Sequence, residues 1–538
     1  MQLTEKSPTS SSPALDASMD RSSSSTSLER SAEKPRGNLV SDRKVLSQAE
    51  QDEASRIDKA LVWKIDRTLV PFLTLLFLMS FLDRINIGVA KLAGLSTDLK
   101  LTSLQYTIAS TIFFVSYVAF EIPSNLVLKK FRPSRWIPFI MVLWAITQTM
   151  MGLVKNYHQL LALRFLLGLF ESGLFPGISM YLGMWYKRRE QSLRIALFFS
   201  AATLAGAFGG ILGWAIAKMA GVGGKNGWSW IFIIEGLMTF VIACIAPFFV
   251  HDFPEQAKFL TEEERKLVLD RLHLDTGVAN AGTFSWKRVK DALTDYKTWL
   301  FMLIYIGCAE PIYSQSLFSP TVVASLGRWT TSQSLLLTVP PYVLAFFTTV
   351  ATAILSDRYG NRGYFMMFWS SLALIGYIIL VTVPIHHPGV LYFAIFLTVA
   401  SIAPQIAITI TWTSNNFGNH YKKAMAMGMV FSLGNSGGIV SSQVYRPKDT
   451  PSFKLGHGVT LGFCAMGFIC STIVHLLMKR ENKRRDELYG LPPTPLRSGE
   501  VHDADTLQRL GLNDKSEEEI IAMGDKRPDF RYIENLAH

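Results

Sequence analysis

Apolar residues gather in twelve blocks along the chain, each about twenty residues long, and polar residues fill the stretches between them. A helix of about 20 apolar residues crosses the roughly 30 Å hydrocarbon core of a bilayer. The pattern therefore predicts an all-α membrane protein with twelve transmembrane helices. We expect them at residues 69–90, 106–128, 136–154, 158–184, 191–217, 230–250, 299–320, 333–355, 363–383, 389–412, 424–444 and 457–478.

A polar segment separates the first six blocks from the last six, which predicts two six-helix halves. The Ser-rich start of the chain lacks apolar residues to bury, so we expect a disordered tail there. In the central segment, a capping box from Thr261 to Glu264 predicts an amphipathic helix that either braces the halves or lies free in solvent. The expected regions are a cytoplasmic N-terminal tail at 1–60, an N-terminal half at 61–250, a cytoplasmic linker at 251–298, a C-terminal half at 299–480 and a cytoplasmic C-terminal tail at 481–538.

Two landmarks recur in both halves at nearly the same spacing. Leu128 corresponds to Asp357 at an offset of 229 residues, and Pro176 corresponds to Pro404 at an offset of 228. A parallel repeat of this kind places a substrate site between the halves, near the middle of the membrane.

Charge sets the expected orientation. With the N-terminus inside, the four short inner loops hold twelve Lys and Arg residues against nine in the six outer loops, and "KRENKRR" follows the last block. Basic loops favour the cytoplasmic side, so both termini are expected there. Membrane-edge residues of this kind also explain the net charge of +11, and we find no nucleic-acid-binding motif, metal-ligand spacing or catalytic motif. We therefore expect no metal, no cofactor and no enzyme activity.

Several motifs resemble those of one transporter superfamily. The loop "SDRYGNR" (356–362) resembles the D-R-x-G-R loop of the major facilitator superfamily, although Leu128 replaces the acid in the first-half copy. The stretch "RFLLGLFESGLFPG" (164–177) looks like the fourth-span signature of its anion:cation symporter family. The resemblance implies the major facilitator fold.

A narrower resemblance is to the fungal allantoate permease family, which includes transporters for nicotinate, pantothenate, biotin and other carboxylates. It runs from about Trp63 to Arg485. The stretches that carry it are "FLDRINIGVAKLAGL" (81–95), "EIPSNLVLKKFRPSRW" (121–136), "DFPEQAKFLTEEER" (252–265) and "YSQSLFSPTVVASLG" (313–327).

Charged residues inside the predicted spans are the candidates for function, because each costs at least ~2.5–3.5 kcal/mol in hydrocarbon. The guanidinium fork of Arg84 matches a carboxylate, so Arg84 is the expected substrate anchor; alternatively it forms a structural ion pair with Asp83 or Glu171. Asp83 lies ~100° around the helix from Arg84 and should face elsewhere. The resemblance gives Glu171 the role of proton carrier; the alternative is an ion pair that orients its helix.

Further candidates are weaker. Arg164 lies two turns from Glu171 on the same helix face and is a second anion contact, a gate or a residue that extends to the membrane edge. The resemblance suggests Tyr313 or Gln315 as a substrate contact. Asn435 in "SLGNSGG" is a further candidate, although the glycines around it also suit close helix packing. Two acidic residues are expected to be mainly structural, namely Glu121 and Glu235. Glu310 lies in the seventh span, where Pro311 can break the helix and expose backbone groups to a cavity. Gating is assigned to Asp357, Arg358 and Arg362.

Together these features favour a proton-coupled importer of a small organic anion by alternating access, in the plasma membrane and as a monomer. Its partners would be the anion, the proton and the lipid bilayer. One alternative is a proton-antiport exporter of a drug or secondary metabolite; that class carries G-P-x-x-G-G in its fifth span, whereas "GAFGGILG" (206–213) lacks the proline. Another alternative is a nutrient sensor that binds but does not transport.

Overall fold

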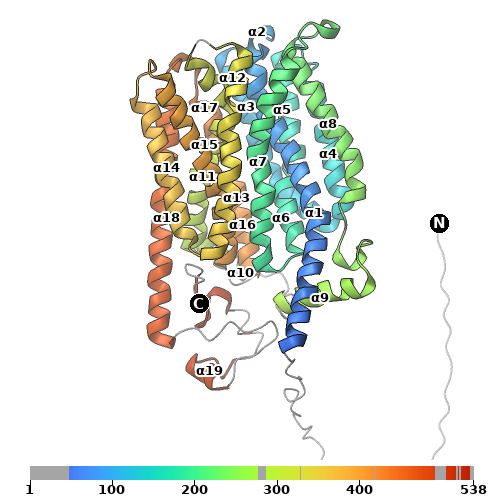
Figure 1. Ribbon diagram of the computed structural model, residues 1–538, viewed down its shortest axis with the longest axis vertical. Coiled ribbons are helices and arrows are strands. Elements are labelled where there is room, and N and C mark those ends of the chain that lie inside the picture. Colours follow the sequence, from blue (N-terminus) through green and yellow to red (C-terminus); the bar gives the residue numbers. More distant parts are fainter. Residues whose placement is uncertain are drawn as a thin grey trace, which may run out of the picture. The chain divides into compact units, whose positions relative to one another are not determined.

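Long helices run side by side in the computed structural model (Figure 1). The structure describes residues 48–276, 286–327, 329–417, 420–490, 504–515, 519 and 523–532. Two units are distinguished, Met1–Lys59 and Ala60–His538; the described part of the first is the helical stretch 48–59. In the second unit, we call the end of the bundle near α2 (Leu95–Asp98) the α2 face, and the end near α9 (Glu262–Thr276) and α10 (Trp286–Thr294) the α9 face.

Each of the twelve predicted spans coincides with a helix or a pair of consecutive helices. In the N-terminal half these are α1 (Gln48–Leu92), α3 (Ser103–Lys130), α4 (Pro133–Met151), α5 (Tyr157–Glu171) with α6 (Leu174–Gly183), α7 (Arg188–Ala217) and α8 (Gly227–Phe249). In the C-terminal half they are α11 (Tyr296–Ser325), α12 (Thr331–Leu337) with α13 (Val339–Tyr359), α14 (Arg362–Thr382), α15 (Pro388–Asn415), α16 (His420–Gly434) with α17 (Gly437–Val444), and α18 (Lys454–Tyr489).

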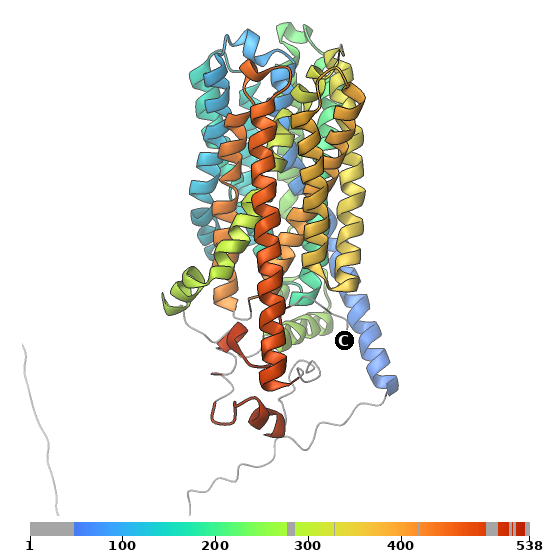
Figure 2. The ribbon, with the colours of Figure 1, turned by 90° about the vertical axis from the view of Figure 1, so that its left-hand side faces the viewer.

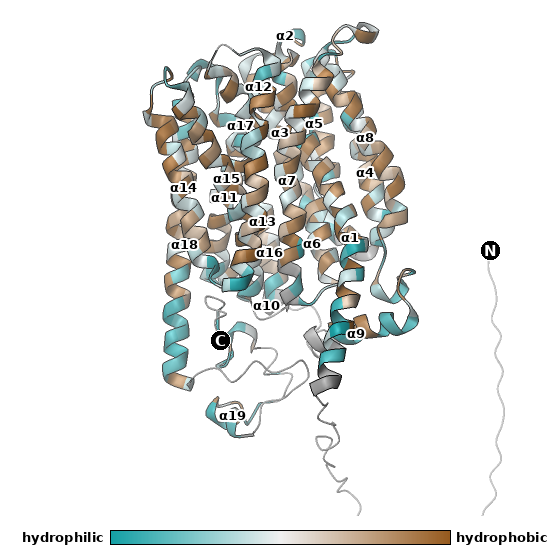
Figure 3. Ribbon diagram, in the orientation of Figure 1, coloured by the Kyte–Doolittle hydropathy of each residue, from teal (hydrophilic) through white to brown (hydrophobic). Residues whose placement is uncertain are grey.

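Within the described ranges, nine helices are long and apolar enough to cross a membrane by length and composition alone. The remaining spans are α4, α11 and the pair α16–α17. Figure 3 shows the resulting pattern, with apolar residues along the bundle and polar residues on α9, α10 and the far end of α18. The expectation of an all-α membrane protein with two six-helix halves is confirmed.

Polar side chains start several of these helices. Thr102 accepts a hydrogen bond from the backbone N–H of Gln105 at the start of α3, and Asn156 accepts one from Gln159 at the start of α5. Asp295 caps α11 in the same way by accepting from the N–H of Lys297. Such caps satisfy backbone donors that the first helical turn leaves free.

The structure adds detail to the sequence reading at three helices. α1 begins at Gln48, inside the segment expected as a disordered tail, because residues 48–60 are rich in strong helix formers; the rest of that tail lies outside the described residues. α18 continues to Tyr489, beyond the boundary at 480. α11 runs unbroken through Pro311, since a single proline removes only one backbone hydrogen bond.

The predicted linker helix is α9, and its capping box is present. The Thr261 N–H donates to the Glu264 carboxylate at 2.9 Å, and the Glu264 N–H donates to the Thr261 hydroxyl at 3.2 Å. Two ion pairs join α9 to the N-terminal half, Lys64–Glu264 at 2.7 Å and Arg271–Glu190 at 2.6 Å. The linker helix is therefore held by the N-terminal half, and these pairs do not reach the C-terminal half.

The two halves meet along α7 against α13 and along α3 against α17. Gly438 lets α17 approach α3, because a Cβ at this position would lie 2.1 Å from the ring of Phe114. Nearby, the Gln443 amide donates to the hydroxyl of Thr111 at 2.6 Å. These contacts lie in the half of the bundle nearer the α2 face.

Residues 524–532 dock onto the α9 face of the C-terminal half, beside the far end of α18 (Figure 2); we call them the C-terminal segment. Asp525 is buried and pairs with Lys297 of α11 and, at 3.0 Å, with Lys422 of α16. Arg485 of α18 donates to the backbone carbonyls of Asp525, Arg527 and Phe530. The segment thus joins the ends of three helices.

Candidate functional site

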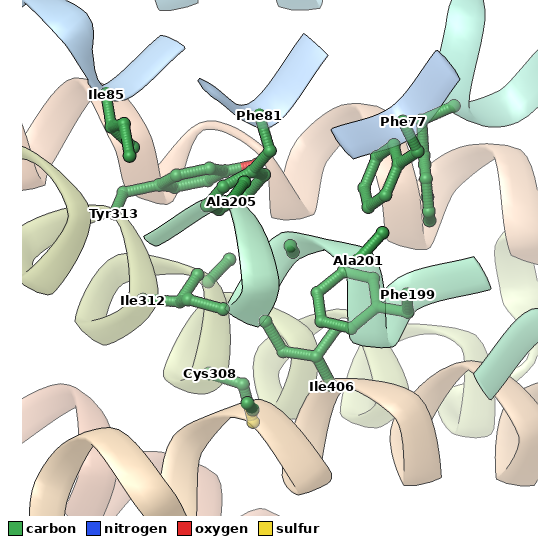
Figure 4. Packing of buried hydrophobic residues seen from close by; sticks show 14 of the residues in the cluster. Phe77, Phe81, Ile85, Phe199, Ala201, Ala205, Cys308, Ile312, Tyr313 and Ile406 are labelled. Carbon is green, nitrogen blue, oxygen red and sulfur yellow. The ribbon is translucent and has the colours of Figure 1, made fainter. Parts of the chain in front are cut away.

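A narrow central cavity lies between the two halves. Phe77 and Phe81 reach it from α1, one helical turn apart, and Ile312 and Ile406 face them from α11 and α15 (Figure 4). The complete lining is Phe77, Phe81, Arg84, Tyr117, Phe175, Phe199, Tyr305, Ile312, Tyr313, Ile406 and Asn435. One charged side chain, Arg84, therefore stands in a mainly aromatic wall.

Arg84 and Glu171 form a buried ion pair at this wall. Nε and Nη2 of Arg84 donate to the same oxygen, Oε1 of Glu171, at 3.1 and 2.5 Å. The hydroxyl of Ser80 donates to that oxygen as well, at 2.6 Å, while Oε2 of Glu171 has no hydrogen-bond partner. Both charged side chains are almost completely shielded from solvent. The pair offsets the large cost of holding either charge alone in a dry interior.

A chain of hydrogen bonds continues from Arg84 across the interface between the halves. Nη1 of Arg84 lies 3.4 Å from the hydroxyl of Tyr313 on α11, which donates to Oδ1 of Asn435 at 2.7 Å. The amide of Asn435 in turn donates to Glu121 of α3 at 3.2 Å. Glu171, Arg84, Tyr313 and Asn435, proposed separately from the sequence, are thus brought together in one network.

Aromatic rings surround the guanidinium of Arg84. Its central carbon lies 4.8 Å from the ring centroid of Tyr117 and 5.5–5.7 Å from those of Phe81, Phe113 and Tyr313. A cation within about 6 Å of a ring face is stabilised by it. The rings also exclude water, which strengthens any ionic contact made here.

Asp83 points away from the cavity, as its position on the helix predicted. Its Oδ2 accepts hydrogen bonds from the indole of Trp144 at 2.7 Å and the hydroxyl of Thr239 at 3.0 Å. Arg164 also lies outside the cavity lining: it is buried within electrostatic range of Asp83 and Glu171. Gly168, between Arg164 and Glu171, leaves room for the neighbouring helix α3.

Gln315 lies apart from the Arg84 network. It lines a second hollow, with Phe81, Ile312 and Tyr342. Its amide donates to the hydroxyls of Tyr377 and Thr398, both at 3.0 Å. These bonds fix Gln315 at the side of the central space that belongs to the C-terminal half.

The three proposed gating residues lie at the turn between α13 and α14. Arg362 is buried and donates to Asp357 at 2.9 Å, whereas Arg358 is exposed. Gly360 takes a φ of 70° there, a backbone conformation that favours glycine. The contact between Arg362 and Asp357 therefore spans the turn between α13 and α14. That these residues act as a gate is a proposal.

Sequence reasoning did not place Glu121 or the aromatic wall at the site. Glu121 was assigned a structural role, yet it ends the network that starts at Glu171. Tyr117 lies four residues before Glu121, so one face of α3 carries both, and that spacing was a usable signal. Tyr305 lies eight residues before Tyr313, on the same face of α11.

Comparison with known proteins gives consistent results. The family described as the Major Facilitator Superfamily matches residues 73–442. An uncharacterized transporter of Schizosaccharomyces pombe is 36% identical over 432 residues, covering 80% of this chain and 85% of that protein. The high-affinity nicotinic acid transporter of Saccharomyces cerevisiae is 29% identical over 512 residues, covering 94% of this chain and 92% of that protein. A solved bacterial homolog of the human lysosomal transporter Spinster, in an inward-facing and occupied conformation, has a TM-score of 0.57 at 14% identity and covers 76% of this chain and 96% of its own.

Proposed function

Because the chain belongs to the Major Facilitator Superfamily, we propose that it is a secondary transporter that takes up a small organic anion together with a proton. The anion is a carboxylate such as nicotinate, allantoate or pantothenate. We place the α9 face in the cytoplasm, because the loops of this face carry the excess of Lys and Arg. We place the protein in the plasma membrane.

The observation that carries the proposal is the ion pair between Glu171 and Arg84, the charged residue that lines the central cavity. While Glu171 is ionised, it occupies two of the donors of Arg84. Protonation of Glu171 removes its charge and frees those donors. A substrate carboxylate then replaces the Glu171 carboxylate at Arg84 in the favoured two-pronged geometry.

This exchange ties the proton to the anion. With an ionised Glu171, a substrate carboxylate would compete with a buried negative charge; with a protonated Glu171 it finds an unpaired guanidinium. Co-transport of a proton also removes the electrical cost of moving an anion into a negative cell, about 2.3 kcal/mol per charge per 100 mV. Coupling and binding therefore depend on the same two side chains.

The lining of the cavity supports a substrate with a flat or apolar body. Seven of its eleven residues are aromatic, and aromatic faces stack favourably on planar rings. Tyr313 and Asn435 add polar groups opposite Arg84 in the C-terminal half. The likeness to a nicotinic acid transporter agrees with a planar carboxylate, so nicotinate is the first substrate to test.

The test is uptake of labelled nicotinate, pantothenate, biotin and allantoate in cells that lack their own carboxylate permeases. Uptake would be measured at acidic and neutral external pH, with and without a protonophore, for the native chain, Glu171→Gln and Glu487→Gln. Glu487 is an exposed residue of α18 and provides the matched control.

The expected result is acid-stimulated, protonophore-sensitive accumulation by the native chain and by Glu487→Gln. Glu171→Gln should lose accumulation but still exchange labelled for unlabelled substrate, because its neutral side chain leaves Arg84 free for the anion. Accumulation that persists in Glu171→Gln would overturn the coupling role. Faster loss of a preloaded toxic compound, without uptake of any acid, would replace import by export.

A further inference from the structure

Three helices of the N-terminal half, α1, α4 and α8, each carry two polar side chains one helical turn apart. One residue from each helix forms a first layer, in which Asp83 accepts hydrogen bonds from Trp144 at 2.7 Å and Thr239 at 3.0 Å. These three side chains are buried, and the two bonds satisfy one oxygen of Asp83. The polar groups of the first layer are therefore mostly hydrogen-bonded to one another.

The second layer lies one turn nearer the α2 face and consists of Asn86, Gln148 and Glu235. Each of the three is at most 1% exposed. None of their six side-chain nitrogen and oxygen atoms makes a well-formed hydrogen bond, although Asn86 interacts with the Glu235 carboxyl. A buried polar group without a partner costs roughly 1–3 kcal/mol, so we expect these groups to hydrogen-bond to one another.

Neighbouring contacts place the three residues at one level of α1, α4 and α8. Asn86 lies close enough to interact with the Glu235 carboxyl. Gln148 and Glu235 flank a tight contact between α4 and α8, where a Cβ on Gly236 would lie 2.6 Å from the backbone nitrogen of Thr149. Two amides thus accompany one carboxyl in an interior without access to solvent.

The buried charges of this half do not balance. Among the side chains that the structure describes, its membrane helices bury four carboxyl groups but two guanidinium groups, on Asp83, Glu121, Glu171, Glu235, Arg84 and Arg164. Arg84 pairs with Glu171, and Arg164 lies within electrostatic range of Asp83 and Glu171. Asp83 lies near Glu235, and its carboxylate carries the same negative charge. An ionised Glu235 would therefore be an uncompensated buried charge.

We propose that Glu235, Asn86 and Gln148 form a second proton-binding site, separate from the substrate cavity. One proton resides on the carboxyl of Glu235, which then donates a hydrogen bond to the amide oxygen of Asn86 or Gln148. The amide nitrogens of the same residues donate to the remaining carboxyl oxygen. A single proton thereby neutralises the charge and satisfies most of the unpartnered atoms of the second layer.

The groups around this site define its response to pH. On α1 the neighbour is Asp83, and beyond it lies Arg164 of α5. α4 contributes Trp144 and Gln148, and α8 contributes Thr239; these side chains carry no charge. Loss of the proton at alkaline pH therefore leaves a carboxylate facing another carboxylate, and the folded protein should lose stability.

One consequence for transport rests on the proposed function. If the proton on Glu235 is exchanged during the transport cycle, the protein moves one proton more per substrate than Glu171 alone can carry. The membrane potential would then drive uptake of a monovalent anion directly. The presence of the proton itself does not depend on this consequence.

The experiment uses the full chain purified into lipid nanodiscs, without substrate. Thermal unfolding would be followed from mildly acidic to alkaline pH for the native chain, Glu235→Gln and Glu171→Gln, in sodium and in choline buffers. Infrared spectra of the same samples would report protonated carboxyl groups. Gln at 235 keeps the shape of the protonated acid and cannot lose a proton.

We expect the melting temperature of the native chain to fall as the pH rises, and that of Glu235→Gln to fall less and to exceed it at alkaline pH. A protonated-carboxyl band should be missing in Glu235→Gln and present in Glu171→Gln. Equal pH profiles with no lost band would overturn the proposal. A stabilisation by sodium over choline that Glu235→Gln abolishes would overturn it in favour of a sodium site. Failure of proton-coupled uptake alone would count against the proposed function and leave these readouts intact.

Discussion

Arg84 directs two nitrogens at a single oxygen of Glu171, and the second oxygen of that carboxylate has no partner. A guanidinium and a carboxylate usually pair through two parallel bonds. The observed pair therefore leaves Arg84 able to make a better contact with another carboxylate. This is the geometric reason to expect that an incoming anion displaces Glu171.

Replacing Arg84 by Lys tests the need for the fork. Lysine keeps the charge but presents a single point donor, so it should still pair with Glu171 and fold. We expect substrate uptake to fall by more than roughly tenfold, because the two-pronged contact is lost. Uptake normalised to surface expression is the measurement, with the exposed Arg446→Lys as control. Equal uptake by both variants would show that Arg84 is not the anchor.

Tyr313→Phe removes the hydroxyl that links the N-terminal half to the C-terminal half and keeps the ring. The lost group contacts Arg84 at 3.4 Å and Asn435 at 2.7 Å. A buried hydrogen bond of this kind contributes roughly 1–3 kcal/mol, so apparent substrate affinity should weaken by about tenfold. Concentration dependence of uptake measures it. An unchanged half-saturation concentration would remove Tyr313 from the site.

The hydrogen bond between Thr111 and Gln443 predicts a cross-link that stops transport. Replacing both by Cys should allow a short bifunctional methanethiosulfonate to bridge them, since a Gln side chain from one position reaches the hydroxyl at the other. The bridge would hold α3 against α17 near the α2 face and block alternating access. The cross-linker should abolish uptake, and a reductant should restore it. Each single Cys variant, in the background of the four native cysteines, should keep its uptake under the same reagent.

Asp525 predicts a pH-dependent release of the C-terminal segment. Burial alone would raise its pKa, but the ammonium groups of Lys297 and Lys422 outweigh burial and hold the pKa of Asp525 below its usual range. The stabilisation is therefore present above the ordinary aspartate pKa of about 4 and is lost as the pH falls through the lower folded-state value.

Limited trypsin digestion after Lys526 measures this release, since Pro528 prevents cleavage after Arg527. Asp525→Asn should be cut faster than the native chain at neutral pH, because two buried lysines then share Asp295 alone as carboxylate partner in the cluster. Asp529→Asn is the control, since Asp529 pairs with Arg527 inside the same segment. Equal cutting of all three chains would mean that Asp525 does not hold the segment.

Local pattern was enough to predict the membrane helices and two of the central charges. The twelve apolar blocks each became a helix or helix pair, because a bilayer requires its spans to be apolar and internally hydrogen-bonded. Arg84 and Glu171 stood out because charges are costly at that depth. The divergent directions of Asp83 and Arg84 followed from helical geometry.

Contacts between helices that are far apart in the sequence could not be predicted from any single stretch of sequence. The hydrogen bonds that connect Tyr313 to Asn435 and Asn435 to Glu121 depend on how the two halves pack. The hydrophobic pattern of the sequence does not specify that packing. Glu235, Asn86 and Gln148 come from three different spans, and each alone resembles an ordinary polar residue of a helix. The C-terminal segment has little apolar periodicity and docks mainly through charges and backbone carbonyls.

The C-terminal segment is synthesised only after every membrane helix has left the ribosome. Until then, Lys297 and Lys422 have one carboxylate of the final four-charge cluster available, that of Asp295. The second half therefore acquires the contacts that join α11, α16 and α18 at its α9 face after these helices have been made. A chain cut short before residue 524 would reach the membrane with an open, positively charged cluster, a feature that cellular quality control could distinguish from the finished protein.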